Sequence, residues 1–193
     1  PWYNAAAVAR CNYYGISGFP TAYFDGTLNY EGGSNSSSMY TYYLPLYQQR
    51  YAIQSPLTID MTGYATGNVY TITLTINKVA AITSTNLKAH LVLTESNISY
   101  AWQGQTEINN AERLMVPDQN GTDINFSSGN QVVLNLSFTK DPSWVTNNCE
   151  LIAFVQDNTT KECLNGCKKM LNNLYLPLPT NFSATPTSGC GPL

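Results

Sequence analysis

From residue 57 onward, apolar and polar residues alternate with a period of two, which places the apolar side chains on one face of a β-strand. The clearest run is 71–76, where Ile72, Leu74 and Ile76 alternate with threonines. Similar runs cover residues 57–62, 87–93 and 132–138, and residues 151–156 are more continuously apolar. The pattern predicts an antiparallel, Ig-like β-sandwich of about seven to nine strands over residues 55–172.

The preceding segment, residues 1–54, carries helix and hairpin signals instead. Asn4 is a suitable N-cap for a helix over residues 5–14. Residues 21–30 are predicted to form a short hairpin whose turn is Asp25-Gly26. The chain as a whole is therefore expected to be of the α+β class.

A second helix is expected over residues 38–51, with Pro45 inside it. Tyr40, Tyr43, Tyr47 and Tyr51 fall on one face of that helix at spacings of three and four residues. An aromatic stripe of this kind predicts packing in the protein core in preference to a ligand platform.

Charged residues make up only 11% of the chain, against about 25% in typical soluble domains. A surface rich in Asn, Ser, Thr and Tyr is expected instead, as in extracellular β-rich proteins. The nine cationic residues form no basic stripe, and the net charge is −3, so nucleic acid is excluded as a partner. No apolar run approaches the roughly 18 residues of a membrane-spanning segment.

The motif Gly18-Phe19-Pro20-Thr21, at the entry to the hairpin, resembles the cis-proline loop of thioredoxin-like domains. The resemblance implies that residues 1–54 are a truncated thioredoxin-like half-domain. Thioredoxin-like oxidoreductases need a low-pKa thiolate in a Cys-x-x-Cys pair facing this loop. The chain contains no Cys-x-x-Cys, which removes the basis for redox chemistry.

A series of short motifs resembles the Omp-twenty-eight family of bacterial outer-membrane proteins, in the same order along the chain. They are PWYNA at 1–5, YYGISGFPT at 13–21, SPL at 55–57, SYAWQG at 99–104, RLMVP at 113–117 with Gly121-Thr122, and FVQD at 154–157. The resemblance implies an exported, surface-associated protein of Bacteroidetes-type bacteria that pairs a thioredoxin-like part with a β-sandwich. It implies no settled activity.

The last segment, residues 173–193, is punctuated by four prolines and is predicted to be a linker. Residues 182–193 resemble the opening strand of a polycystic-kidney-disease-type repeat, which occurs in tandem in bacterial surface proteins. The chain also begins at Pro1 without a methionine. These features favour a piece of a longer modular protein.

The five cysteines are an odd number, which in an exported protein predicts up to two disulfides and one unpaired thiol. Cys149, Cys163 and Cys167 are the disulfide candidates. If residues 150–157 pair with residues 161–168 across a short turn, Cys149 lies near Cys167, and Cys149–Cys163 is the alternative. The Cys-x-x-x-Cys spacing is not typical of zinc sites, so neither a metal nor a cofactor is expected.

Two further segments contain residue types that can bind ligands. Residues 118–123 resemble part of a calcium loop but lack its final Glu, which favours a tight turn at Asn120-Gly121. His90, the only histidine, shares a strand face with Lys88 and is expected at the solvent or at an interface.

Tyr100 and Trp102 are the candidate ligand contacts, because an exposed tryptophan can stack on a sugar. A partly buried tryptophan that anchors a loop is the alternative.

Taken together, these features favour a non-catalytic extracellular or cell-surface module of a larger secreted bacterial protein. It would act by structure and binding, for example as a protomer of a surface fibre or matrix. Its expected partners are copies of itself, other surface proteins or glycans. Two alternatives remain, a fragment of a thiol-disulfide oxidoreductase-like protein and a carbohydrate-binding module. No catalytic residue is assigned.

Overall fold

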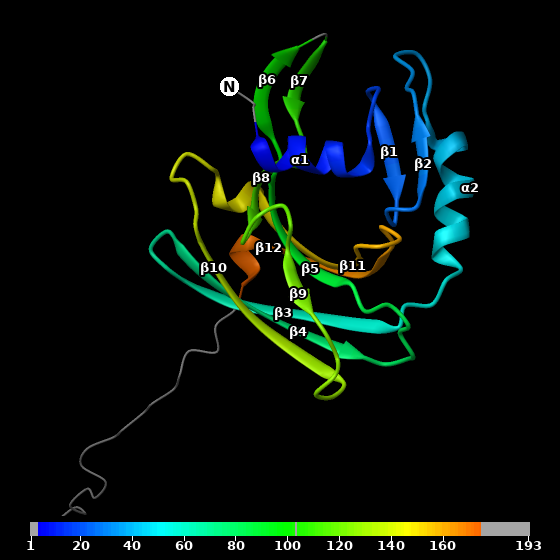
Figure 1. Cartoon of the computed structure of the whole chain (residues 1–193). Coiled ribbons are helices and arrows are strands. Elements are labelled where there is room, and N and C mark those ends of the chain that lie inside the picture. The colour runs from blue at the N-terminus through cyan, green and yellow to red at the C-terminus, as the bar shows by residue number, and fades with distance from the viewer. Residues whose placement is uncertain (1–3, 103, 175–193) are drawn as a thin grey trace, which may run out of the picture.

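The computed structural model describes residues 4–102 and 104–174. Two antiparallel sheets form most of it (Figure 1). The three-stranded sheet has the order β10–β4–β3, with β3 at Leu57–Thr66, β4 at Val69–Lys78 and β10 at Gln131–Thr139. The five-stranded sheet has the order β12–β11–β5–β8, and β9 also pairs with β5; its strands are β5 Leu87–Glu95, β8 Ala111–Val116, β9 Thr122–Ile124, β11 Cys149–Asp157 and β12 Cys163–Met170.

The two sheets pack against each other through a shared apolar core. Alternation along β4 buries Ile72 and Leu74, while Leu91 of β5 and Leu151 of β11 contribute to the same cluster from the other sheet. Burying one such side chain stabilises the fold by about 1.5–3 kcal/mol. The expectation of a β-rich antiparallel fold is confirmed.

The N-terminal part adds two helices and a hairpin, close to where the sequence predicts them. They are α1 Ala5–Tyr14, β1 Thr21–Phe24, β2 Leu28–Glu31 and α2 Tyr40–Tyr51. The Asn4 side chain caps α1 by accepting hydrogen bonds from the backbone of Ala6 and Ala7. Gly15 ends α1 with a φ of 69°, a left-handed conformation that favours glycine.

Helix α1 lies over the face of the five-stranded sheet that points away from the three-stranded sheet (Figure 1). Strand β5 is largely buried on both faces, and His90, only 1% exposed, stacks on Phe154 at 4.8 Å between ring centroids. Of the two placements expected for His90, the structure selects the interface. The Asn4 amide also donates to the backbone and side-chain oxygens of Glu112 on β8, both at 3.2 Å, which fixes the start of α1.

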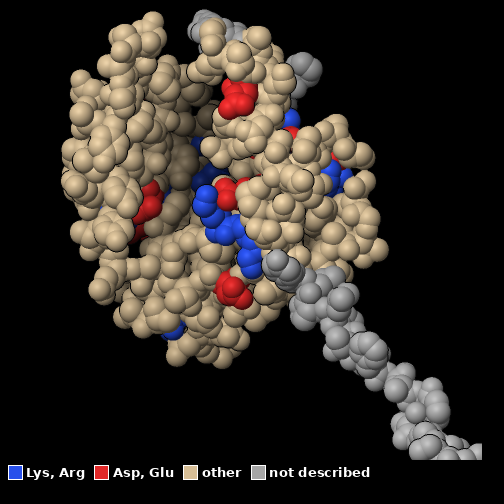
Figure 2. Space-filling view, turned by 180° about the vertical axis from the view of Figure 1, so that it is seen from behind, with Lys and Arg blue, Asp and Glu red and all other residues tan. Residues whose placement is uncertain are grey.

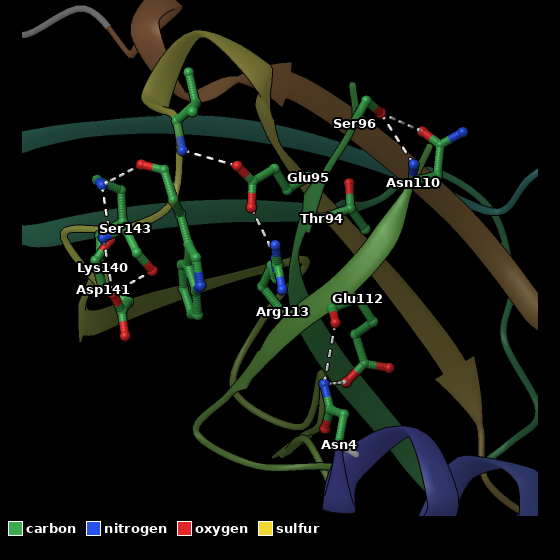
Figure 3. A network of polar contacts seen from close by, with 12 residues as sticks. Asn4, Thr94, Glu95, Ser96, Asn110, Glu112, Arg113, Lys140, Asp141 and Ser143 are labelled. Carbon is green, nitrogen blue, oxygen red and sulfur yellow. Dashed lines mark hydrogen bonds and ion pairs between the residues drawn. The ribbon is translucent and has the colours of Figure 1, made fainter. Parts of the chain in front are cut away.

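A polar network closes one edge of the five-stranded sheet (Figure 3). The buried carboxylate of Glu95 accepts hydrogen bonds from the side chain of Arg113 and from the backbone of Val145, each at 2.8 Å. Lys140, only 4% exposed, donates to the carbonyl oxygen of Trp144 at 2.6 Å. The loop that follows β10 is thereby tied to β5 and β8.

The remaining elements are a projecting hairpin and two single-turn helices. The hairpin consists of β6 Ile98–Trp102 and β7 Gln105–Ile108, and the 3₁₀ turns are η1 Thr146–Asn148 and η2 Leu171–Asn173. No helix in the described residues is long and apolar enough to span a membrane. The predicted repeat-like strand at 182–193, with Cys190, lies outside the described residues.

The described cysteines Cys11, Cys149, Cys163 and Cys167 form no disulfide with one another, and the strand register contradicts the two pairings proposed for Cys149. Strands β11 and β12 do pair, but the register places Cys167 opposite Ala153. Cys149 lies four residues before Ala153, about 13 Å along the strand, and Cys163 is farther still. Both distances exceed the roughly 7 Å between Cα atoms that a disulfide can bridge.

Candidate binding cleft

A cleft of about 570 Å³ lies between the N-terminal hairpin, the end of α2 and the start of β12. The space-filling view from behind shows that the surface is hollowed between the lobe containing α2 and the body of the molecule (Figure 2). Five aromatic side chains line the cleft, namely Tyr23, Phe24, Tyr47, Tyr51 and Phe154. Arg50 and Asn165 add polar groups to the same walls.

The tyrosine stripe of α2 is mostly exposed. Tyr40 is 63% exposed, Tyr47 50% and Tyr51 77%. Tyr43 alone of the four packs inward, against Phe24 and Tyr30 of the hairpin. The prediction of core packing is therefore wrong for three of the four residues.

The size of the hairpin explains this exposure. Strands β1 and β2 have four residues each, whereas α2 has twelve, so the hairpin covers only part of the helix. The rings of Tyr47 and Tyr51 stack on each other at 5.5 Å between centroids and border the open cleft.

Ion pairs and a backbone hydrogen bond hold the hairpin and α2 on the sheet. The Arg50 guanidinium pairs with Asp25 at 3.3 Å and with Glu162. The backbone N–H of Cys163 donates to the carbonyl of Asp25 at 2.8 Å. Gly26 is required here, because a Cβ at this position would lie 2.0 Å from the carbonyl oxygen of Lys161.

A second anchor joins α1 to β11. The Arg10 guanidinium donates to the side-chain oxygen of Gln156 at 2.8 Å, and the Gln156 amide donates to the Tyr14 hydroxyl at 2.7 Å. The same amide donates to the carbonyl of Lys161 at 2.6 Å. Gln156 has no exposed surface, and burial raises the pKa of Tyr14. The cleft therefore has firmly held walls.

The thiols of Cys163, at the cleft, and Cys149, in the core, are poor nucleophiles. Burial raises the pKa of Cys163, which lines the cleft, to about 11, and the charge of Asp25 adds to this effect. Burial likewise raises the pKa of Cys149 to about 11. Reactive thiols have a pKa below the ordinary value of about 8.5, so both thiols are protonated at neutral pH.

The residues singled out from the sequence lie elsewhere. The Phe19–Pro20 peptide bond is cis, and the Thr21 hydroxyl donates to the carbonyl of Gly18 at 2.7 Å, but this loop does not line the cleft. Tyr100 lies on the β6–β7 hairpin and is 38% exposed. The side chain of Trp102 is outside what the structure describes.

Residues 118–123 form the predicted tight turn. The Asn120 backbone donates to the Asp118 carboxylate at 2.7 Å, and Gly121 has a φ of 69°. Within residues 4–102 and 104–174, no group of three or more His, Cys, Asp or Glu side chains is arranged to hold a metal ion.

Arg50, Phe154 and Asn165 were missed by the reasoning from sequence. Their spacing along the chain carries no signal, because the cleft forms only when the N-terminal part docks on β11 and β12. The one usable hint was the concentration of tyrosines before residue 52.

Comparisons with known proteins place the fold but not the function. No protein-family model matches the sequence, and no curated protein matches it. Among solved structures, the chain is similar to HBP35 of Porphyromonas gingivalis, with a TM-score of 0.74 and 16% identity. That match covers 94% of this chain and 62% of HBP35.

A domain of the outer membrane lipoprotein Omp28 from Porphyromonas gingivalis also matches, with a TM-score of 0.46 and 17% identity over 59% of this chain and 86% of that domain. The fold of this chain is thus of the class represented by HBP35, of which it spans about three-fifths of the length.

Proposed function

We propose that the chain is a non-catalytic module of a larger exported bacterial surface protein and that it acts by binding through the aromatic cleft. In this proposal, residues 1–54 are a truncated thioredoxin-like half-domain and residues 55–172 an Ig-like sandwich, as in Omp28-type proteins. The exposed, stacked pair Tyr47 and Tyr51 at the mouth of the cleft carries the proposal.

Tyrosines suit recognition because they offer a large contact area and a hydroxyl while losing little conformational entropy on binding. Four tyrosines of α2 are exposed, namely Tyr40, Tyr42, Tyr47 and Tyr51, and a contiguous exposed apolar surface of this kind marks interaction sites. Arg50 and Asn165 also line the cleft. Arg50 pairs with Asp25 and Glu162, and Asn165 is hydrogen-bonded to the backbone of Leu57 and Gly166. An extended polypeptide segment, from a second copy or another surface protein, is the partner that matches this mixture.

The chemistry of the thiols supports binding over turnover. Cys163 is the thiol at the cleft, and its raised pKa opposes formation of a thiolate. The alternative of an oxidoreductase fragment requires the opposite shift. The low charge of the chain supports an extracellular or surface location.

A binding screen with matched variants tests the proposal. The whole chain is titrated against an array of extended peptides, including peptides from its own sequence. We expect the double substitution Tyr47→Ala and Tyr51→Ala to weaken the best binders by about tenfold or more, as for aromatic hot spots. Tyr64→Ala, which removes a 43% exposed tyrosine from β3, should leave binding unchanged.

Peptide binding that ignores the α2 tyrosines would contradict the assignment to this cleft. Reduction of insulin disulfides by the chain would contradict the non-catalytic reading and favour the oxidoreductase alternative.

A further inference from the structure

A second cavity, of about 360 Å³, borders the C-terminal half of α1, at Ala9, Arg10 and Tyr13. Its walls come from α1, from the start of β5 and from the loops that follow β8 and β11. The polar lining consists of Arg10, Tyr13, Lys88, Gln119, Asn120 and Asn158. Two of these side chains are cationic and three are amides, and no carboxylate is among the lining residues.

The Arg10 guanidinium is held in place without an acidic partner. Gln156 fixes one of its nitrogens, and the group stacks over the Tyr13 ring at 4.5 Å from the ring centroid. In the described part of the chain, no carboxylate pairs with Arg10. A positive charge that is oriented in advance and not neutralised is suited to bind a carboxylate.

Lys88 adds a second positive charge to the cavity. Its amine pairs with Asp123 at 2.6 Å, and because the Asp123 side chain is 82% exposed this ion pair is weak, so a ligand carboxylate can compete with Asp123 for Lys88. The Lys161 amine lies 5.2 Å from the Tyr13 ring centroid and donates to the Tyr13 carbonyl at 2.8 Å. Two cations, Arg10 and Lys161, therefore lie against the Tyr13 ring. The negative charge of Asp157 acts on Tyr13 in the opposite sense.

An unsatisfied hydroxyl marks the same place. The Tyr13 hydroxyl is buried and has no hydrogen-bond partner in the described residues. Buried polar groups are nearly always hydrogen-bonded, so this hydroxyl needs a partner from outside the described residues, a water or a ligand atom. The two ring nitrogens of His90 are also buried without a partner, and the ring lies directly against Gly121, next to Asn120.

We propose that this cavity binds an acidic sugar of the uronic acid class. Arg10 and Lys88 hold the carboxylate, while the amides of Gln119, Asn120 and Asn158 bind the ring hydroxyls. Amides both donate and accept hydrogen bonds, which is what sugar hydroxyls require. The Tyr13 hydroxyl gains a partner, and the volume lies within the range of small-molecule sites.

Sodium glucuronate is the probe, and glucose is its neutral counterpart. Calorimetric titration of the whole chain should detect glucuronate and not glucose. The imidazole of His90 is the only one in the chain, so its proton resonance should shift on binding. A bound carboxylate near Arg10 and Lys88 should also raise the pKa of His90.

Charge substitutions locate the site. Gln119→Glu places a carboxylate in the lining, and Lys88→Gln removes a cation; each should lower glucuronate affinity by about tenfold, the effect of a charge-assisted hydrogen bond. Lys168→Gln is the matched control, because Lys168 is a 71% exposed cation outside the cavity. The glucuronate affinity of the Lys168→Gln variant should stay within about twofold of that of the unmodified chain.

Equal binding of inorganic phosphate and glucuronate would show that the cavity selects charge alone and would overturn the sugar assignment. Absence of glucuronate binding would overturn the proposal altogether. So would unchanged affinity in both Gln119→Glu and Lys88→Gln, with folding of each variant verified by thermal unfolding.

Discussion

The Arg10 guanidinium and the Gln156 side-chain oxygen lie 2.8 Å apart, although 146 positions separate them in the sequence. This contact joins the first helix to the central pair of the five-stranded sheet. Arg10 also lines the cationic cavity, and α2 and the N-terminal hairpin line the aromatic cleft. The N-terminal segment therefore forms walls of both cavities and is not an appendage to the sheets.

Replacing Gln156 with leucine should destabilise the fold by about 2–4 kcal/mol, because it leaves Arg10, the Tyr14 hydroxyl and the Lys161 carbonyl without their buried partner. Urea unfolding monitored by fluorescence measures the change. Gln131→Leu is the control. The Gln131 side chain is exposed and its amide donates one hydrogen bond, to the side-chain oxygen of Asn77, so the free energy of unfolding should change by no more than about 0.5 kcal/mol. Equal effects of the two substitutions would refute the role of Gln156 as an anchor.

Gly26→Ala should displace the hairpin, because the added Cβ would lie 2.0 Å from the Lys161 carbonyl at a φ of 74°. We expect a loss of about 3 kcal/mol or more in unfolding free energy. Gly67→Ala has a similar φ of 61° but open space around it, so only the backbone cost of about 1 kcal/mol should appear. If thermal unfolding shows the same loss for both variants, the close approach at Gly26 is not what holds the hairpin.

Stability should fall as the pH drops from about 6.5 to about 4. Burial and the positive charges of Arg10 and Lys88 lower the pKa of His90 to about 4. The negative charge of Asp118 acts in the opposite direction but is the smaller effect. The unfolded chain takes up this proton near pH 6.5, the folded chain only near pH 4, so the stabilisation is complete above pH 6.5 and is lost on acidification.

The expected contribution of His90 is about 3 kcal/mol between the two pH values. Urea unfolding at pH 7 and pH 4 measures it, with His90→Leu as the comparison that lacks the titrating group. An imidazole resonance that titrates near its ordinary pKa would disprove the prediction, as would an unchanged pH dependence in the variant.

Alkylation of Cys163 by iodoacetamide at pH 8 should be at least about a hundredfold slower than that of an unstructured cysteine, because its pKa of about 11 leaves few thiolates. Peptide mass spectrometry follows each cysteine separately. In urea the difference should disappear. Rapid labelling of Cys163 in the folded chain would speak for a reactive thiol and against a binding-only cleft.

Local sequence signals predicted the elements well. The alternation at 71–76 became β4, the Asn4 cap and Gly15 stop bound α1, and Asp25-Gly26 turns the hairpin. Each of these signals acts through neighbours a few residues apart, so it can be recognised without knowing the rest of the fold.

Pairing register was harder to predict. The sequence indicated that β11 and β12 are neighbours, yet the expected Cys149–Cys167 contact failed because the register sets Cys167 opposite Ala153. A slip of two or four residues leaves the hydrophobic alternation intact, so the pattern alone does not distinguish between such registers.

The sequence by itself determined the two helices, the N-terminal hairpin, the strands with clear alternation and which faces of those strands are apolar, but it did not predict β6 to β9. Only the tertiary structure decided that His90 is buried against Phe154 and Gly121, that Tyr47 and Tyr51 stay in water, and that Arg10 meets Gln156. The physical reason is the sequence distance over which each interaction acts. Periodicity and capping are set by residues a few positions apart in the chain. Burial and pairing depend instead on which surfaces of distant segments have enough area to cover each other.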